Sequence, residues 1–172
     1  IGAPFADPED NINAGEIYVV FGQTEPFSAE IELAALDGAL DGEEVSLVCF
    51  RLRTLSSATS NPSPVYRLIL RLFDIRSLGL GLPYGDQGFG LRRQTFDTVG
   101  GFQEIPLMED LAFARSCRRL GRIHRLPLEV KTTARRFERH PLRTAAMFAI
   151  FPTLFRLGVE PQVLARWYGV AR

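Results

Sequence analysis

The chain has 172 residues, 46% of them hydrophobic, and equal numbers of acidic and basic side chains. This length and composition suit one globular domain, or one domain with an appendage, and exclude wholesale disorder. The longest apolar run, residues 145–151, ends at Pro152 and is too short to span a bilayer. Cys49 and Cys117 lie far apart without metal or redox spacing, so we expect two buried free thiols.

The charges are divided unevenly along the chain. Residues 1–44 contain eleven acidic side chains and no Lys or Arg, whereas residues 45–172 contain twenty basic and nine acidic ones. The first segment therefore has a net charge of −11 and the second a net charge of +11. This asymmetry indicates two modules of different origin. All but one of the basic residues are arginine, whose planar fork suits carboxylate and phosphate groups.

The amino-terminal module is predicted to consist of short strands and turns. Residues 16–21 are β-rich, and residues 7–15 are dense in Asp, Asn, Pro and Gly. The stretch IGAPFADPEDNINAGEIYVVFG resembles part of an FG-GAP repeat, the blade unit of integrin-like β-propellers. One blade cannot bury its apolar faces alone, so we expect residues 1–40 to form a loose β-hairpin fragment. Residues 37–44 are predicted to be a junction.

The remaining residues, 41–172, alternate between predicted strands and helices. A largely apolar run, interrupted by Ser46 and Arg51, predicts a buried strand at the start of this region. The firmest helix has acidic residues at its amino end and arginines at its carboxyl end, and it stops at a glycine. The predicted elements, in chain order, are a strand at 45–52, a helix at 65–78, a strand at 85–92, helices at 94–99 and 108–120, strands at 122–125 and 130–133, and helices at 141–157 and 161–168.

Several short motifs follow one another between residue 50 and the carboxyl terminus: FRLR, PYGDQG with LRR, GGF, IPLMED, RRLGR and TTARRFER. In pattern and order they resemble the carboxyl-terminal half of family 2 glycosyltransferases, closest to the arsenosugar-type subgroup. The resemblance covers about three quarters of the chain. It implies an α/β fold, the acceptor-side half of a Rossmann-like GT-A nucleotide-diphospho-sugar transferase. The implied activity is inverting transfer from a nucleotide-sugar to an acceptor hydroxyl.

Glu109 and Asp110 open the helix predicted at 108–120. An inverting transferase needs a carboxylate that takes the proton from the acceptor hydroxyl, and a carboxylate at a helix start is fixed in direction. The resemblance implies that Asp110 is this base and that Glu109 flanks it or touches the acceptor. An acidic first turn is also a common structural feature of helices. The Gly-Gly-Phe turn and Pro106 upstream favour the catalytic interpretation.

Two further pairs are candidates for substrate binding. Asp86 and Gln87 follow a turn, and their side chains match sugar hydroxyls as donors and acceptors, although a polar turn that orders its own backbone is the alternative. Arg135 and Arg136 could stabilise the departing nucleoside diphosphate with forked guanidinium groups, although a solvated basic run fits them equally. The resemblance implies Trp after this arginine pair, and Phe137 stands there instead.

The donor-binding portion of a GT-A enzyme ends in an Asp-x-Asp-type metal motif, which this sequence lacks. The nearest candidates, residues 7–9 and the pair Asp37 and Asp41, lie in the other module or at the wrong spacing. The resemblance implies Mg²⁺ or Mn²⁺ as cofactor, but the Asp-x-Asp ligands that the family uses for it are not in this sequence. We therefore expect an acceptor half that is weakly active or inactive alone, because a diphosphate leaving group needs a counter-charge.

The expected partners are a nucleotide-sugar donor and an unidentified acceptor, with no nucleic acid and no obligate protein partner. The expected location is the cytoplasm, with a peripheral membrane contact through the apolar face of residues 148–155 as one use of that face. Packing of this face against the sheet is the other. Two alternatives to an active transferase stay open: a non-catalytic fusion remnant, and an FG-GAP-type calcium-binding or adhesion fragment.

Overall fold

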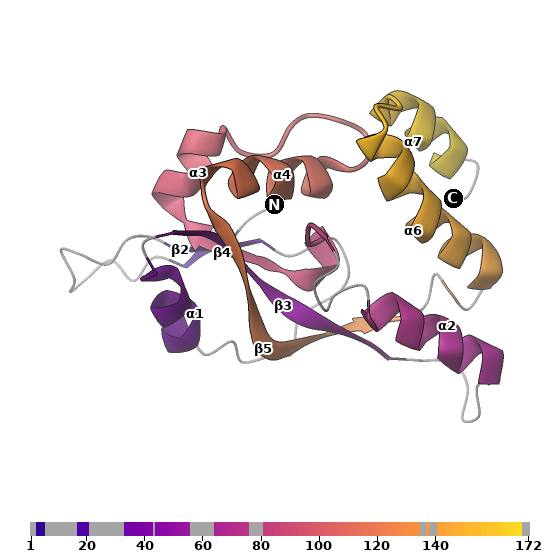
Figure 1. Cartoon of the computed structure of the whole chain (residues 1–172), viewed down its shortest axis with the longest axis horizontal. Helices are drawn as coiled ribbons and strands as arrows, with labels where there is room; N and C mark the ends of the chain where they lie inside the picture. Colours follow the sequence, from indigo (N-terminus) through magenta and orange to yellow (C-terminus); the bar gives the residue numbers. More distant parts are fainter. Residues whose placement is uncertain are drawn as a thin grey trace.

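The computed structural model describes residues 3–5, 17–20, 33–42, 44–55, 64–75, 81–134, 137 and 141–169. These residues form a mixed α/β structure (Figure 1). Its strands are β1 (Ala3–Phe5), β2 (Ile17–Val20), β3 (Val45–Leu55), β4 (Phe89–Arg92) and β5 (Arg122–Thr133). Its helices are α1 (Leu33–Leu40), α2 (Pro64–Ile75), the 3-10 helix η2 (Gly85–Gln87), α3 (Arg93–Val99), α4 (Glu109–Leu120), α6 (Pro141–Arg156) and α7 (Pro161–Gly169).

The strands form one five-stranded sheet in the order β1-β2-β4-β3-β5. β4 runs antiparallel to both of its neighbours, with Ile17 opposite Arg92 on one side and Val48 opposite Gly90 on the other. β3 and β5 pair in parallel, and Val45 lies opposite Arg122. The amino-terminal strands thus continue the sheet formed by the rest of the chain. The sequence predicted the strand at 16–21 but not this pairing.

Helices cover both faces of the sheet, as Figure 1 shows for α1 and α2 on one side and α3 and α4 on the other. On the first side Leu36 of α1 and Phe73 of α2 pack with Phe50 of β3. On the second side Phe113 of α4 packs with Cys49 of β3 and other residues of the sheet. Successive side chains of β3 point to opposite faces, and both faces are buried. The apolar run at residues 47–50 is explained by this double burial.

The structure corrects three of the predicted elements. The segment predicted as a junction at 37–44 begins inside α1, because Leu36 and Leu40 are buried against the sheet and stabilise a helical turn there. The two strands predicted at 122–125 and 130–133 are one strand, β5, which follows β3 through a shift in register between Arg125 and Glu129. The strand predicted at 85–92 begins with η2 instead. The loop between residues 56 and 63 lies outside the described residues.

The apolar face of α6 packs inward. Phe148 makes an edge-to-face contact with Phe73 at a centroid distance of 5.0 Å and stacks on Phe137 at 5.8 Å, and Phe151 is buried. These contacts confirm packing as the use of Phe148 and Phe151. Over the described part of the chain, the search for a helix long and apolar enough to cross a bilayer finds none.

Candidate functional site

The candidate site lies at the amino end of α4. Met108, the residue before the helix, has φ 68° and ψ 19°, in the left-handed region that side chains with a Cβ rarely adopt. Its carbonyl accepts the first helical hydrogen bond, from the amide of Ala112 at 2.9 Å. Among the described residues Met108 alone combines a side chain with a positive φ. Strained backbone of this kind is concentrated at functional sites in proteins.

Asp110 joins α4 to the turn that precedes β4. Its Oδ2 accepts a hydrogen bond from the amide of Gly85 at 2.8 Å, and its Oδ1 accepts one from the amide of Leu111 at 2.7 Å. The carboxylate is partly buried and points toward the turn that contains Asp86, not into bulk water. Because each carboxylate oxygen has two lone pairs, these two bonds leave room for a further hydrogen bond. Each of the two oxygens therefore retains capacity to accept one more hydrogen bond.

The turn itself is held rigidly by Gln87. The side-chain oxygen of Gln87 accepts from the amide of Tyr84 at 3.1 Å, and its side-chain nitrogen donates to the carbonyl of Phe50 at 3.1 Å. Gln87 is only 1% exposed. The structure thus gives Gln87 a supporting role, in which it anchors the turn to β3. Its neighbour Asp86 is half-buried, and the Oδ1 atom of its carboxylate is itself buried.

Glu109 lies beside Asp110 at the first position of α4 and is exposed. The loss of surrounding water raises the pKa of the Glu109 carboxyl above its ordinary value, a hydrogen bond from its own main chain opposes this, and the charge of Asp110 adds to the rise. The main cause of the rise is desolvation, and the neighbouring charge of Asp110 is the smallest contribution.

The Gly-Gly-Phe turn packs against α4, the helix that begins with the candidate site. Gly100 and Gly101 both have positive φ values, 83° and 73°, which glycine adopts without strain. Phe102 then stacks on Phe113 of α4, with ring centroids 4.2 Å apart and planes 20° apart. The two glycines thus permit a tight turn, and Phe102 packs that turn against α4.

Two arginines that the sequence did not single out lie close to Gly81, which precedes the turn that contains Asp86. Arg125 of β5 donates through Nη2 to the Gly81 carbonyl, and its buried Nε has no hydrogen-bond partner in the described part of the chain. From α6, Nη2 of Arg156 lies 2.9 Å from the position that a Cβ atom on residue 81 would occupy. Arginine is so frequent in this chain that no sequence signal distinguishes these two.

The other predicted groups are placed as follows. Arg135 and Arg136 lie outside the described residues. Across the described ranges no three His, Cys, Asp or Glu side chains gather in a group that could hold a metal ion. Those residues therefore do not fit a protein-bound Mg²⁺ or Mn²⁺. Both cysteines are buried free thiols, as predicted.

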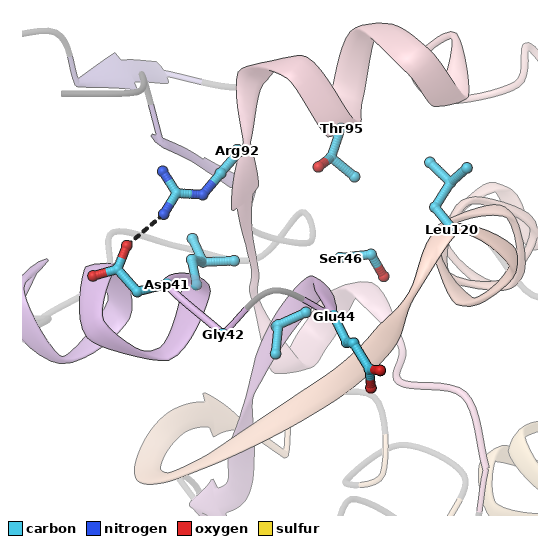
Figure 2. Close-up of a pocket in the computed structure, with 9 residues that line it drawn as sticks. Asp41, Gly42, Glu44, Ser46, Arg92, Thr95 and Leu120 are labelled. Atoms are coloured by element: carbon cyan, nitrogen blue, oxygen red, sulfur yellow. Dashed lines mark hydrogen bonds and ion pairs between the residues drawn. The ribbon is translucent and has the colours of Figure 1, made fainter. Parts of the chain in front are cut away.

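A pocket of about 320 Å³ opens at the other end of α4, where Leu120 forms part of its lining (Figure 2). Asp41 and Arg92 form an ion pair at 2.6 Å across its rim, so these two charges neutralise one another. The hydroxyl of Ser46 donates to the carbonyl of Cys117 at 2.8 Å. The pocket lies about 15 Å from Asp110, given a rise of 1.5 Å per helical residue. It is separate from the candidate site.

Comparison of the chain with models of protein families, with characterised proteins and with solved structures finds no match.

Proposed function

We propose that this chain takes part in inverting glycosyl transfer from a nucleotide-sugar to an acceptor hydroxyl, as the acceptor side of a GT-A-type enzyme. The observation that supports this best is the position of Asp110. Its carboxylate is held by two main-chain amides, beside Asp86, at the start of a helix. The mixed α/β sheet with helices on both faces is compatible with such a fold.

In the proposed reaction an oxygen of Asp110 accepts the proton of the acceptor hydroxyl. The acceptor oxygen forms a bond to the anomeric carbon from the face opposite the leaving group. The bond between that carbon and the diphosphate oxygen breaks, and its electron pair leaves with the nucleoside diphosphate. The configuration at the anomeric carbon is inverted. Asp86 hydrogen-bonds an acceptor or sugar hydroxyl, and Gln87 holds the turn in which Asp86 lies.

The leaving diphosphate needs positive charge close to it. Arg135 and Arg136 are the arginines that the sequence indicates for this task, and Arg125 and Arg156 both approach Gly81, which precedes the turn that contains Asp86. A divalent ion bound with the nucleotide would supply further positive charge. Because the described residues provide no ligand group for that ion, we propose that the chain alone turns over weakly.

The test is release of nucleoside diphosphate from UDP-, GDP- and dTDP-sugars, with Mg²⁺ or Mn²⁺ added, by the chain and by Asp110→Asn. Glu129→Gln is the matched control, because Glu129 is an exposed carboxylate that pairs with Arg53 away from the turn. We expect release to be lost in Asp110→Asn and retained in Glu129→Gln. The product should have the inverted anomeric configuration by NMR. Equal release by all three proteins would refute the proposal.

The alternatives differ in what they bind. A calcium-binding FG-GAP fragment should gain thermal stability on addition of Ca²⁺. A fusion remnant should neither bind a nucleotide-sugar in a titration nor release nucleotide. Saturable donor binding without turnover would instead leave the acceptor-side role in place and indicate that catalysis needs further chain.

A further inference from the structure

Helix α2 has an apolar surface that faces solvent. Leu70 and Phe73 are buried against the sheet. Four other aliphatic side chains of the helix are exposed: Val65 by 62%, Leu68 by 56%, Leu72 by 57% and Ile75 by 45%. We call these four side chains the α2 stripe. The helix therefore has one apolar face in the core and a second one in water.

The α2 stripe is continuous. Its members are spaced at intervals of three and four residues, which places them within an arc of about 80° on a helix with about 100° per residue. Arg67 and Arg71 are exposed and border the stripe. The one acidic residue of α2, Asp74, is half-buried, and its carboxylate accepts from the hydroxyl and the amide of Thr54 at 2.6 Å and 3.0 Å. The solvent side of α2 therefore combines aliphatic and cationic side chains only.

We infer that the α2 stripe binds the surface of a bilayer that contains anionic phospholipid. Scattered exposed leucines are ordinary, but four aliphatic side chains in one stripe beside arginines are typical of helices that lie in a membrane interface. The aliphatic side chains enter the acyl boundary while the two arginines meet lipid phosphates. An anionic lipid surface complements both features at once. This inference does not depend on glycosyl transfer, because no residue of the Asp110 site is involved.

The experiment is vesicle flotation with phosphatidylcholine alone and with added phosphatidylserine. We expect the chain to bind the anionic vesicles, more weakly at high salt because exposed charges are screened. The double variant Leu68→Gln/Leu72→Gln should weaken binding by about tenfold or more, since two aliphatic side chains no longer enter the apolar layer. Arg67→Gln and Arg71→Gln should each weaken it by about fivefold, on anionic vesicles only.

Leu120→Gln is the matched control. Leu120 is a leucine with 52% exposure, it follows Arg118 and Arg119, and it lies on α4, away from the α2 stripe. This variant should bind vesicles like the parent chain, and circular dichroism should show the same helix content in every protein. The inference is overturned if the parent chain ignores anionic vesicles, if the double variant binds unchanged, or if Leu120→Gln loses as much. It is also overturned if the stripe instead joins two copies of the chain, seen as a dimer in sedimentation that the double variant abolishes.

Discussion

Asp110 accepts a hydrogen bond from the main-chain amide of Gly85, and this bond joins the start of α4 to the turn before β4. The same carboxylate is the proposed base, so one side chain has both a structural and a chemical task. Substitution by asparagine and substitution by alanine separate the structural task from the chemical one. Asparagine retains one acceptor oxygen for the amide but cannot take a proton, whereas alanine loses both capacities.

We therefore expect Asp110→Asn to lower any transfer by about 100-fold or more, while its free energy of unfolding falls by less than about 1 kcal/mol. Asp110→Ala should lose the same activity and about 1–3 kcal/mol of stability, because two amides lose their acceptor. Urea unfolding and nucleotide release check both values. Full turnover in a folded Asp110→Asn protein would assign Asp110 to structure alone.

Glu109 provides a pH-dependent test of the same region. The pKa of Glu109 is raised in the folded state, chiefly by loss of water around its carboxyl, so the native protein binds this proton more tightly than the unfolded chain does. The ionised carboxylate therefore destabilises the fold above the folded-state pKa, and the cost disappears as the pH falls below the ordinary value of 4.5.

Glu109→Gln should accordingly be more stable than the parent chain at neutral pH and equal to it in acid. Because Glu109 is exposed, solvent screening limits the gain to at most about 0.5 kcal/mol. Thermal unfolding between pH 3.5 and 7 measures the difference, with the exposed Glu104→Gln as the control for loss of a surface charge. A gain at low pH only would contradict the assigned direction.

Local sequence signals predicted most of the elements correctly. Acidic residues at one end of α4, arginines at the other and a terminal glycine predicted its bounds to within a residue. The buried strand β3 was predicted from a largely apolar run of residues. The prediction for α1 failed, because Gly38 and two aspartates indicate a turn while burial of Leu36 and Leu40 stabilises a helix.

Contacts between residues that are far apart in the chain could not be predicted from the sequence. The sequence around Gln87 does not show that its side-chain amide reaches the carbonyl of Phe50. Gln87 was therefore predicted to bind substrate. Similarly, the sequence predicted α2 as a helix, but only the structure shows which of its leucines are buried and which are exposed. Both outcomes depend on which elements become neighbours in the sheet, and tertiary contacts decide that.

The two cysteines should be unreactive in the native protein. Burial raises the pKa of the Cys49 thiol to about 11, partly opposed by the charge of Arg125, and raises that of Cys117 to about 12. At pH 8 the reactive thiolate is therefore about 0.1% or less of either group. We expect no reaction with an aromatic disulfide reagent in buffer and two thiols released in denaturant. Rapid reaction of one thiol in buffer would show that its side of the sheet opens.

The contact between Leu36 and Gly90 tests whether the acidic amino-terminal module docks on the basic remainder. Leu36 of α1 is fully buried, and a Cβ atom on residue 90 would lie 2.7 Å from its Cδ2. Gly90→Ala should therefore destabilise the fold by about 1–3 kcal/mol through overpacking. Leu36→Ala should cost about 2–5 kcal/mol by leaving a cavity.

In the double variant the alanine at position 90 occupies part of the space that Leu36 vacates. We expect Gly90→Ala to lower the free energy of unfolding less in the Leu36→Ala background than in the parent chain. A double-mutant cycle measured by urea unfolding should give a coupling energy of about 1 kcal/mol or more. Gly38→Ala is the control, because nothing lies within 4 Å of the added Cβ and the position is helical. It should be stabilising by about 0.5–1 kcal/mol. Additive effects at residues 36 and 90 would mean that α1 does not pack on β4 in solution, and the two modules would then be independent.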